Sequence, residues 1–200
     1  MSSGVIGTKG VPRAEREEQI LHEAIDEFAV NGYAGASMVD IARRAGISKP
    51  LIYQYFGSKD GLYLACLHAV SGDLLGRLED AELDVDDSVV SRIYPLRAIF
   101  EALEPQRHAW RMLFDPSMPT SGAIAAAAGD YRARTMQIAA SGSARFLQAR
   151  GIASAKDAEA LTAVWMGIVN SVVEWWLEHP EESAEQMIER CYRLLNAILG

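Results

Sequence analysis

The chain has 200 residues, 50% of them hydrophobic, and its 27 acidic and 19 basic side chains give a net charge of −8. This length and hydrophobic content are ample for a buried core in one or two domains. No run of about 18 apolar residues free of charge occurs, and the amino-terminal residues do not resemble a signal peptide. The sequence therefore predicts a cytoplasmic protein and excludes a membrane-spanning or secreted one.

The first predicted helix spans Arg13 to Asn31 and follows an arm, residues 1–12, whose glycines and proline favour flexibility. Its apolar side chains recur every three or four residues on one face: Ile20, Leu21, Ala24, Ile25 and Phe28. Asn31 and Gly32 are expected to end this helix. Lys9 and Arg13 either follow a DNA minor groove or belong to an arm without DNA contact.

A second, short helix is predicted to begin at Met38. The Ser37 hydroxyl can accept a backbone N–H of its first turn, and Asp40 can reach back to the Ser37 amide, as in a capping box. Its apolar face has helical spacing: Met38, Ile41, Ala42 and Ala45. Gly46 supplies the positive φ that ends the helix.

A third helix of about two turns is predicted after Ser48, a second cap, with Pro50 tolerated in its first turn. Isolated helices shorter than about 12 residues are marginal in water, so this one must be braced by the first helix. Phe56 is expected in the resulting small core. Three helices joined by a glycine turn predict a helix-turn-helix, which points to DNA.

The polar side chains of the third helix support this interpretation. Lys49, Tyr53, Gln54, Tyr55 and Lys59 offer ammonium, phenol and amide groups that neutralise phosphates or bind base edges. An acidic chain binds DNA poorly without a local positive face. No acid lies between Asp40 and Asp60, and residues 1–65 carry a net charge of only −1. The predicted recognition segment is thus locally basic.

The stretch from Ala45 to Leu62, AGISKPLIYQYFGSKDGL, resembles the signature of the TetR family of bacterial transcriptional regulators. The first helix and its Asn-Gly-Tyr exit are also in register, so the resemblance covers about residues 13–65. It implies an all-α fold of about nine helices. The amino-terminal helix-turn-helix domain would be followed by a helical domain for ligand binding and dimerisation.

The resemblance also implies roles for individual residues. In proteins of the family, the residues at the positions of Tyr53, Tyr55 and Lys59 usually contact the DNA backbone. In the family, the residues at the positions of Lys49, Pro50 and Gln54 usually face bases. Pro50 stands where many relatives have glycine or alanine, and it is expected to pack on a thymine methyl. Tyr55 stands where the family frequently has histidine, but a phenol also donates to phosphate.

The remaining candidates for DNA contact are Ser37, Ser48 and Arg43. One of Arg43 and Arg44 is expected to reach a phosphate, while the other pairs with Asp40 or Asp26. The alternative for Lys49, Gln54 and Lys59 is that they are ordinary solvated surface residues.

Prolines, glycines and an acidic loop interrupt the rest of the chain and divide it into predicted helices. Their ranges are 59–82, 88–103, 105–114, 122–149, 155–178 and 181–199. We expect residues 1–12 to be an arm, 13–62 the DNA-binding domain, and 63–200 the sensing and dimerisation domain. Asp84, Asp86 and Asp87 are expected in a solvated loop.

The last two predicted helices are apolar over most of their circumference, more than one chain's core requires. A second copy would cover them as a four-helix bundle, and the family's dimers are built this way. Two recognition helices about 34 Å apart would then bind a palindromic operator. The alternative is that Trp175 and Trp176 fill an intrachain core.

Large or adaptable side chains in the middle helices suit an aromatic or lipophilic effector. The candidate ligand-binding residues are His68, Phe100, His108, Trp110, Phe114, Met136, Trp165, Met166 and Asn170. The alternative is that these side chains belong to the ordinary hydrophobic core. We expect ligand binding to tilt the fourth helix, so that the two half-sites no longer fit and repression is relieved.

Enzymatic interpretations are disfavoured, because the four histidines are dispersed and no nucleophile elbow, phosphate loop or metal-ligand spacing occurs. We expect no cofactor and no metal, and Cys66 and Cys191 as buried reduced thiols. The main alternative function is a helical DNA-binding or architectural protein without an effector. A further one is a ligand-binding bundle that has lost operator binding.

Overall fold

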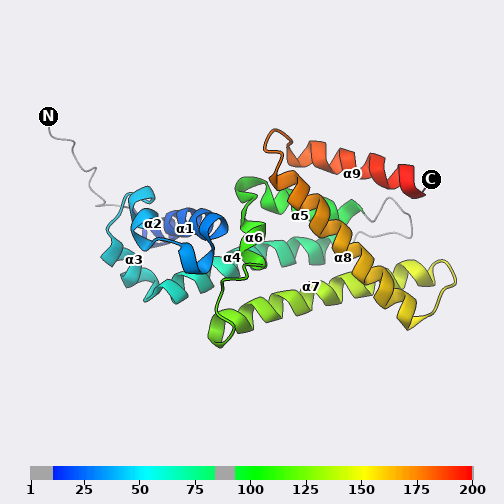
Figure 1. Cartoon of the computed structure of the whole chain (residues 1–200), viewed down its shortest axis with the longest axis horizontal. Helices are drawn as coiled ribbons and strands as arrows, with labels where there is room; N and C mark the ends of the chain where they lie inside the picture. Colours follow the sequence, from blue (N-terminus) through cyan, green and yellow to red (C-terminus); the bar gives the residue numbers. More distant parts are fainter. Residues whose placement is uncertain (1–10, 84–92, 200) are drawn as a thin grey trace.

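The computed structural model describes residues 11–83 and 93–199 and is all-helical over them, with nine α-helices and one 3₁₀ turn. Figure 1 shows a small amino-terminal unit of α1, α2 and α3 at one end of an elongated molecule. The fourth helix leads from it into a larger bundle. The predicted fold class and number of helices are confirmed.

The first helix, α1 (Arg13–Gly35), buries the predicted stripe, with Ile20, Ala24 and Phe28 at most 1% exposed. It is kinked at Gly32, whose φ of 68° and ψ of 172° are non-helical. The predicted stop at this position is thus a kink, after which one further helical turn completes α1.

The helix-turn-helix consists of α2 (Met38–Arg44) and α3 (Lys49–Phe56), joined through Gly46 at φ 65°. The Ser37 hydroxyl accepts the Asp40 amide at 3.2 Å, as expected. The predicted return bond from Asp40 is wrong, because the Ser37 amide instead donates to the Glu27 carboxylate of α1 at 2.9 Å. A residue of α1, not of α2 itself, completes this cap.

The fourth helix, α4 (Lys59–Leu83), runs without interruption through the predicted domain boundary at residue 62. Its first turns belong to the amino-terminal core: Tyr63 is fully buried and meets Phe28 edge-to-face, with 4.8 Å between ring centroids. A rigid helix therefore links the recognition unit to the rest of the molecule.

The second half contains α5 (Ile93–Leu103), a 3₁₀ turn (Glu104–Gln106), α6 (Ala109–Leu113), α7 (Gly122–Gln148), α8 (Ala155–Leu177) and α9 (Ala184–Leu199). The helix predicted over 105–114 is instead the 3₁₀ turn followed by the short α6, because Pro105 has no amide to continue an α-helix. The predicted loop 84–88 and helix start at 88–92 lie outside the described residues.

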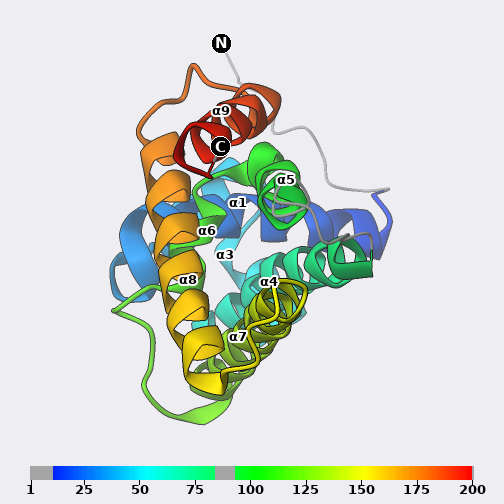
Figure 2. The same ribbon diagram turned by 90° about the vertical axis from the view of Figure 1, so that its right-hand side faces the viewer.

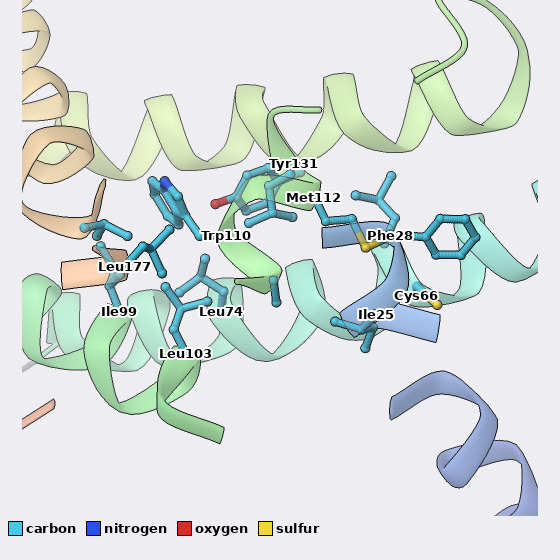
Figure 3. Close-up of a cluster of buried hydrophobic side chains, with 14 of the residues drawn as sticks. Ile25, Phe28, Cys66, Leu74, Ile99, Leu103, Trp110, Met112, Tyr131 and Leu177 are labelled. Carbon is cyan, nitrogen blue, oxygen red and sulfur yellow. The ribbon is translucent and has the colours of Figure 1, made fainter. Parts of the chain in front are cut away.

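The bundle packs around one continuous apolar cluster that extends from Ile20 to Cys191. Figure 2, an end-on view, shows α5 beneath α9 on one side, α4 beside α7 on the other, and α8 closing the flank. Figure 3 shows part of this cluster, from Phe28 in the amino-terminal unit to Leu177 at the end of α8. Cys66 and Cys191 are buried free thiols, as predicted, and burial raises the pKa of both.

The last two helices differ in what covers them. Met187, Ile188 and Cys191 of α9 are buried and α9 packs on α5, so the prediction that one chain's core does not need this apolar face is wrong for these side chains, whereas Leu194 is 50% exposed. In α8, Trp176 is fully buried while Trp175 is half-buried and stacks on His179.

The described part of the chain contains one helix, α8, that by length and composition alone is apolar enough to cross a membrane. Its mean hydropathy is 1.3 and only 28% of the apolar window is buried within the chain. The structure thus leaves most of an unusually apolar helix uncovered.

Candidate functional site

The third helix presents one face to solvent at the outer end of the amino-terminal unit (Figure 1). Ile52 is fully buried and anchors α3 to the core. The side chains predicted to meet DNA at its amino-terminal end and outer face are all exposed: Ser48, Lys49, Pro50, Tyr53 and Gln54. Fixing Ile52 inward therefore directs a continuous polar surface outward.

Ser48 makes no side-chain capping bond, contrary to its predicted role as a cap. Pro50 has no amide proton to donate, and the Leu51 amide donates to the Ser48 carbonyl oxygen at 3.0 Å. The Ser48 hydroxyl at the amino terminus of α3 is therefore available for an external acceptor.

Tyr53 is 38% exposed, and the Lys49 ammonium lies 5.8 Å from the centre of its ring. Tyr55 is half-buried, with the Arg13 guanidinium 5.1 Å from its ring centre. Arg13 at the start of α1 thus joins the positive surface around α3. The contact places the start of α1 beside the recognition helix.

Both arginines of α2 pair with acids. Arg43 contacts Asp40 at 2.7 Å with 71% of its side chain exposed, and this guanidinium, with Ser37, lowers the pKa of Asp40. Arg44 pairs with Glu23 at 3.3 Å and Glu27 at 2.9 Å rather than with Asp26. Arg44 therefore braces α2 against α1, and Arg43 is the freer of the two to reach a phosphate.

Lys59 does not point into solvent. Its ammonium donates to the Ala36 and Ala34 carbonyl oxygens at 2.8 and 3.4 Å and lies 5.1 Å from the centre of the Tyr33 ring. Together with Ser37, which is half-buried, it stabilises the turn between α1 and α2. A phosphate contact by Lys59 requires the ammonium to leave these carbonyls.

A polar connection that sequence patterns did not indicate joins the α6–α7 loop to α1; we call it the clasp and define it by Gly32, Tyr33, Asp115 and Ser117. The buried Asp115 carboxylate accepts the Tyr33 amide at 2.6 Å and the Ser117 amide at 2.8 Å. The Ser117 hydroxyl accepts the Ala34 amide at 3.1 Å. The two side chains cap the helical turn that resumes after the Gly32 kink.

The clasp also reaches α4. The Tyr63 hydroxyl lies 3.3 Å from the Asp115 carboxylate, and burial, with this negative charge, raises the pKa of Tyr63. The Tyr33 hydroxyl donates to Asp60 at 2.7 Å. Movement of α6 would therefore change the contacts of the clasp with both α1 and α4.

A small cavity of about 40 Å³ lies in the bundle between α4, α5, α6, α7 and α8. Three of the predicted ligand-binding residues line it: Trp110, Trp165 and Met166. Sequence reasoning missed Thr135 and did not select Tyr131 as a polar group. The polar atoms of Trp110, Tyr131 and Thr135 are all buried without a hydrogen-bond partner.

The structure places the other predicted ligand-binding residues elsewhere. His68, His108 and Asn170 are exposed, whereas Phe100 is fully buried against Trp176 with 5.1 Å between ring centroids. Phe114 is 40% exposed beside Trp110.

Met136 lines a separate, open groove of about 640 Å³ between α7 and the start of α8. As for metals, the described residues contain no group of three His, Cys, Asp or Glu side chains placed to hold an ion.

Residues 20–66 match the model of the family described as bacterial regulatory proteins, tetR family. The transcriptional activator FasR of Mycolicibacterium smegmatis is 35% identical over 116 residues, which are 58% of this chain and 53% of FasR. Residues 20–66 are thus a TetR-family segment. The chain spans about half the length of FasR, but the putative mycofactocin biosynthesis regulator MftR of Mycobacterium tuberculosis is 24% identical over 94% of this chain and 93% of MftR.

The similarity in fold to solved TetR-like regulators extends over most of the chain. FadR of Bacillus subtilis, solved with stearoyl-CoA, superposes with a TM-score of 0.70 over 92% of this chain and 97% of FadR, at 16% identity. The matched TetR-family segment contains α2, α3 and the start of α4, and so every residue from Ser37 to Lys59 that is predicted to contact DNA. The residues that line the cavity all lie outside that segment.

Proposed function

We propose that the protein is a transcriptional regulator of the cytoplasm that binds a palindromic DNA operator as a homodimer and is released by a small, lipophilic effector. The observation that carries DNA binding is the outer face of α3, where the exposed Ser48, Lys49, Tyr53 and Gln54 gather while Ile52 holds the helix in the core. These groups suit phosphates and base edges in a major groove. Relatives named as transcriptional regulators support the proposal.

The dimer proposal rests chiefly on α8. Its side chains opposite the intrachain core form an apolar stripe along the helix: Leu161, Val164 and Ile168. Val164 is 59% and Ile168 37% exposed. In α9, Tyr192 and Leu194 are also exposed, although other residues of this helix pack on α5. A second copy would cover this stripe in an isologous interface.

Replacing Val164 with Glu is expected to convert the dimer to a monomer, because the carboxylate would be buried without a partner between two copies of α8. Sedimentation velocity should show the mass fall from about twice 21.9 kDa to 21.9 kDa. Val30 of α1 is 71% exposed, so Val30→Glu is the matched control and should leave the dimer intact. A dimer that survives Val164→Glu would show that α8 is not the interface.

Release of the protein from DNA on effector binding would depend on movement of α6. Trp110 of α6 lines the cavity, and Asp115, five residues later, holds α1 in the clasp. A ligand that enlarges the cavity would displace α6 and α4 and change the separation of the two recognition helices. FadR with stearoyl-CoA supports a lipophilic effector for this fold. Occupying an operator that overlaps a promoter represses transcription, whereas the relative FasR is named an activator.

One observation favours a second candidate, a DNA-binding or architectural protein without an effector. The cavity of about 40 Å³ is far below the roughly 300 Å³ or more of drug-sized ligand sites. Such a protein would bind DNA with little sequence preference and no response to small molecules.

Lys49→Ala tests DNA binding by the proposed face. In a dimer two Lys49 ammonium groups leave the interface, so the slope of log K against log salt on a mixed-sequence duplex should fall in magnitude by up to about 2. Lys156→Ala removes the same charge at the exposed start of α8, far from α3, and should leave the slope unchanged. Equal effects of the two substitutions would refute the assignment of α3.

A further inference from the structure

The cavity between α4, α5, α6, α7 and α8 combines an apolar lining with three unsatisfied polar atoms. Trp110 Nε1, Tyr131 Oη and Thr135 Oγ1 are buried without a hydrogen-bond partner, and Trp110 and Tyr131 are only 3% and 2% exposed. Leaving a buried polar group unpaired is costly, and three around one cavity are unusual for a native protein. Their concentration marks a place where something else supplies the partners.

The positions of two of these groups are fixed by aromatic packing. Phe114 contacts both rings, with its ring centroid 5.0 Å from that of Trp110 and 6.4 Å from that of Tyr131. Figure 3 shows the Tyr131 hydroxyl directed toward Trp110. Groups held in this way are preorganised for a ligand.

Their chemistry restricts the ligand. The indole N–H of Trp110 only donates. Burial raises the pKa of Tyr131 to about 12, against a smaller opposing effect of the neighbouring Thr135 hydroxyl, so the phenol keeps its proton and can donate as well. None of the described residues that line the cavity is charged. A buried carboxylate or ammonium would therefore lack a counter-charge.

We propose that this cavity binds a neutral, largely apolar molecule through one hydrogen-bond acceptor, such as a ketone, ester or amide carbonyl, to which Trp110 and Tyr131 donate. The inference deepens the proposed function, because it takes this ligand to be the effector. The carbonyl end lies against α6 and α7, and the apolar remainder displaces the half-buried Trp165 and Met166 of α8.

The size of the cavity links binding to movement. A volume of about 40 Å³ is well below the roughly 150 Å³ that holds a benzene ring in an apolar cavity. A ligand with one aromatic ring must therefore separate α8 from α4 and α7. Because Trp110 belongs to α6, the same ligand acts directly on the helix that leads into the clasp.

The test uses three probes of nearly equal size: acetophenone, which has a carbonyl acceptor; isopropylbenzene, which has none; and benzoate, which is charged. Binding to ¹⁵N-labelled protein is followed on the indole N–H signals of its four tryptophans, with that of Trp110 assigned from Trp110→Phe. Acetophenone should move the Trp110 signal downfield as the N–H gains an acceptor. Benzoate should not bind.

Tyr131→Phe separates a ligand-binding role from a structural one. It should weaken acetophenone binding by about tenfold and leave isopropylbenzene within about twofold. The same substitution should raise Tm by about 2–4 °C, because it removes an unpaired hydroxyl. A merely structural hydroxyl would lower Tm on removal.

Three results would overturn the proposal: binding of benzoate, a Tyr131→Phe variant with lower Tm and unchanged acetophenone affinity, or no response of Trp110 to any probe. None of these affects DNA binding, which is measured separately on duplex DNA. Conversely, acetophenone binding without a change in DNA affinity would uphold the ligand chemistry and refute effector release.

Discussion

Gly32→Ala is expected to lower the free energy of unfolding by about 3 kcal/mol, or Tm by roughly 6–12 °C. Gly32 has φ 68° and ψ 172°, a backbone conformation available essentially only to glycine. An added Cβ would also lie 2.7 Å from the Ser117 hydroxyl and 3.2 Å from the Asp115 carboxylate. The substitution therefore strains the backbone and opens the clasp at the same time.

The control is Gly151→Ala, in the turn between α7 and α8. Gly151 also has a positive φ, 76°, but nothing lies within 4 Å of an added Cβ. Its substitution should cost only the backbone strain, about 1 kcal/mol. Thermal unfolding of both variants compares them directly, and equal losses would mean that the close approach of the α6–α7 loop contributes nothing.

Glu27→Ala is expected to lower the free energy of unfolding by about 2–3 kcal/mol. Glu27 is 4% exposed; one carboxylate oxygen accepts the Ser37 amide at 2.9 Å and the other pairs with Arg44 at 2.9 Å. Its removal leaves the cap of α2 without its α1 partner and weakens the brace at the other end of α2. Operator affinity should fall with stability, because α2 positions α3.

Glu23→Ala provides the comparison on the same helix. Glu23 also pairs with Arg44, at 3.3 Å, but its side chain is 27% exposed and Ser37 does not bond to it. An ion pair of this kind contributes little, so the loss should remain below about 1 kcal/mol. If chemical denaturation gave Glu23→Ala and Glu27→Ala the same loss, the cap would not depend on Glu27.

Local signals in the sequence were sufficient for the recognition unit. Ser37 and Gly46 mark helix ends through bonds and dihedral angles within a few residues, and the stripe around Phe28 follows from helical periodicity alone. Ser48 is the instructive exception. A serine at this position predicted a side-chain cap. However, Pro50 has no amide proton, and the Leu51 amide donates to the Ser48 carbonyl oxygen instead of the hydroxyl.

Contacts between distant parts of the chain could not be predicted in this way. The Ser37 amide donates to Glu27 instead of Asp40, and the Tyr33 amide donates to Asp115, which follows α6. Nothing in the local pattern around Asp115 distinguishes it from an ordinary loop acid. Only the fold brings it to the kink at Gly32.

The sensor residues were the least predictable, for a physical reason. Aromatic and methionine side chains at helical spacing serve a core as well as a cavity, and Phe100 and Trp110 illustrate the two outcomes. What distinguishes this cavity from the core around it is polar atoms left without partners, as at Tyr131 and Thr135. That property depends on the packing of five helices and has no signature in the sequence.

Selection of binding sites from random duplex DNA with the full chain tests the central claim most directly. A dimeric regulator that binds bases through α3 should enrich a palindrome whose half-sites are about one helical turn, roughly 34 Å, apart. Tyr53→Ala should bind the enriched sequence much more weakly. Recovery of DNA without any shared motif, held only by salt-sensitive binding, would contradict the account and favour an architectural protein.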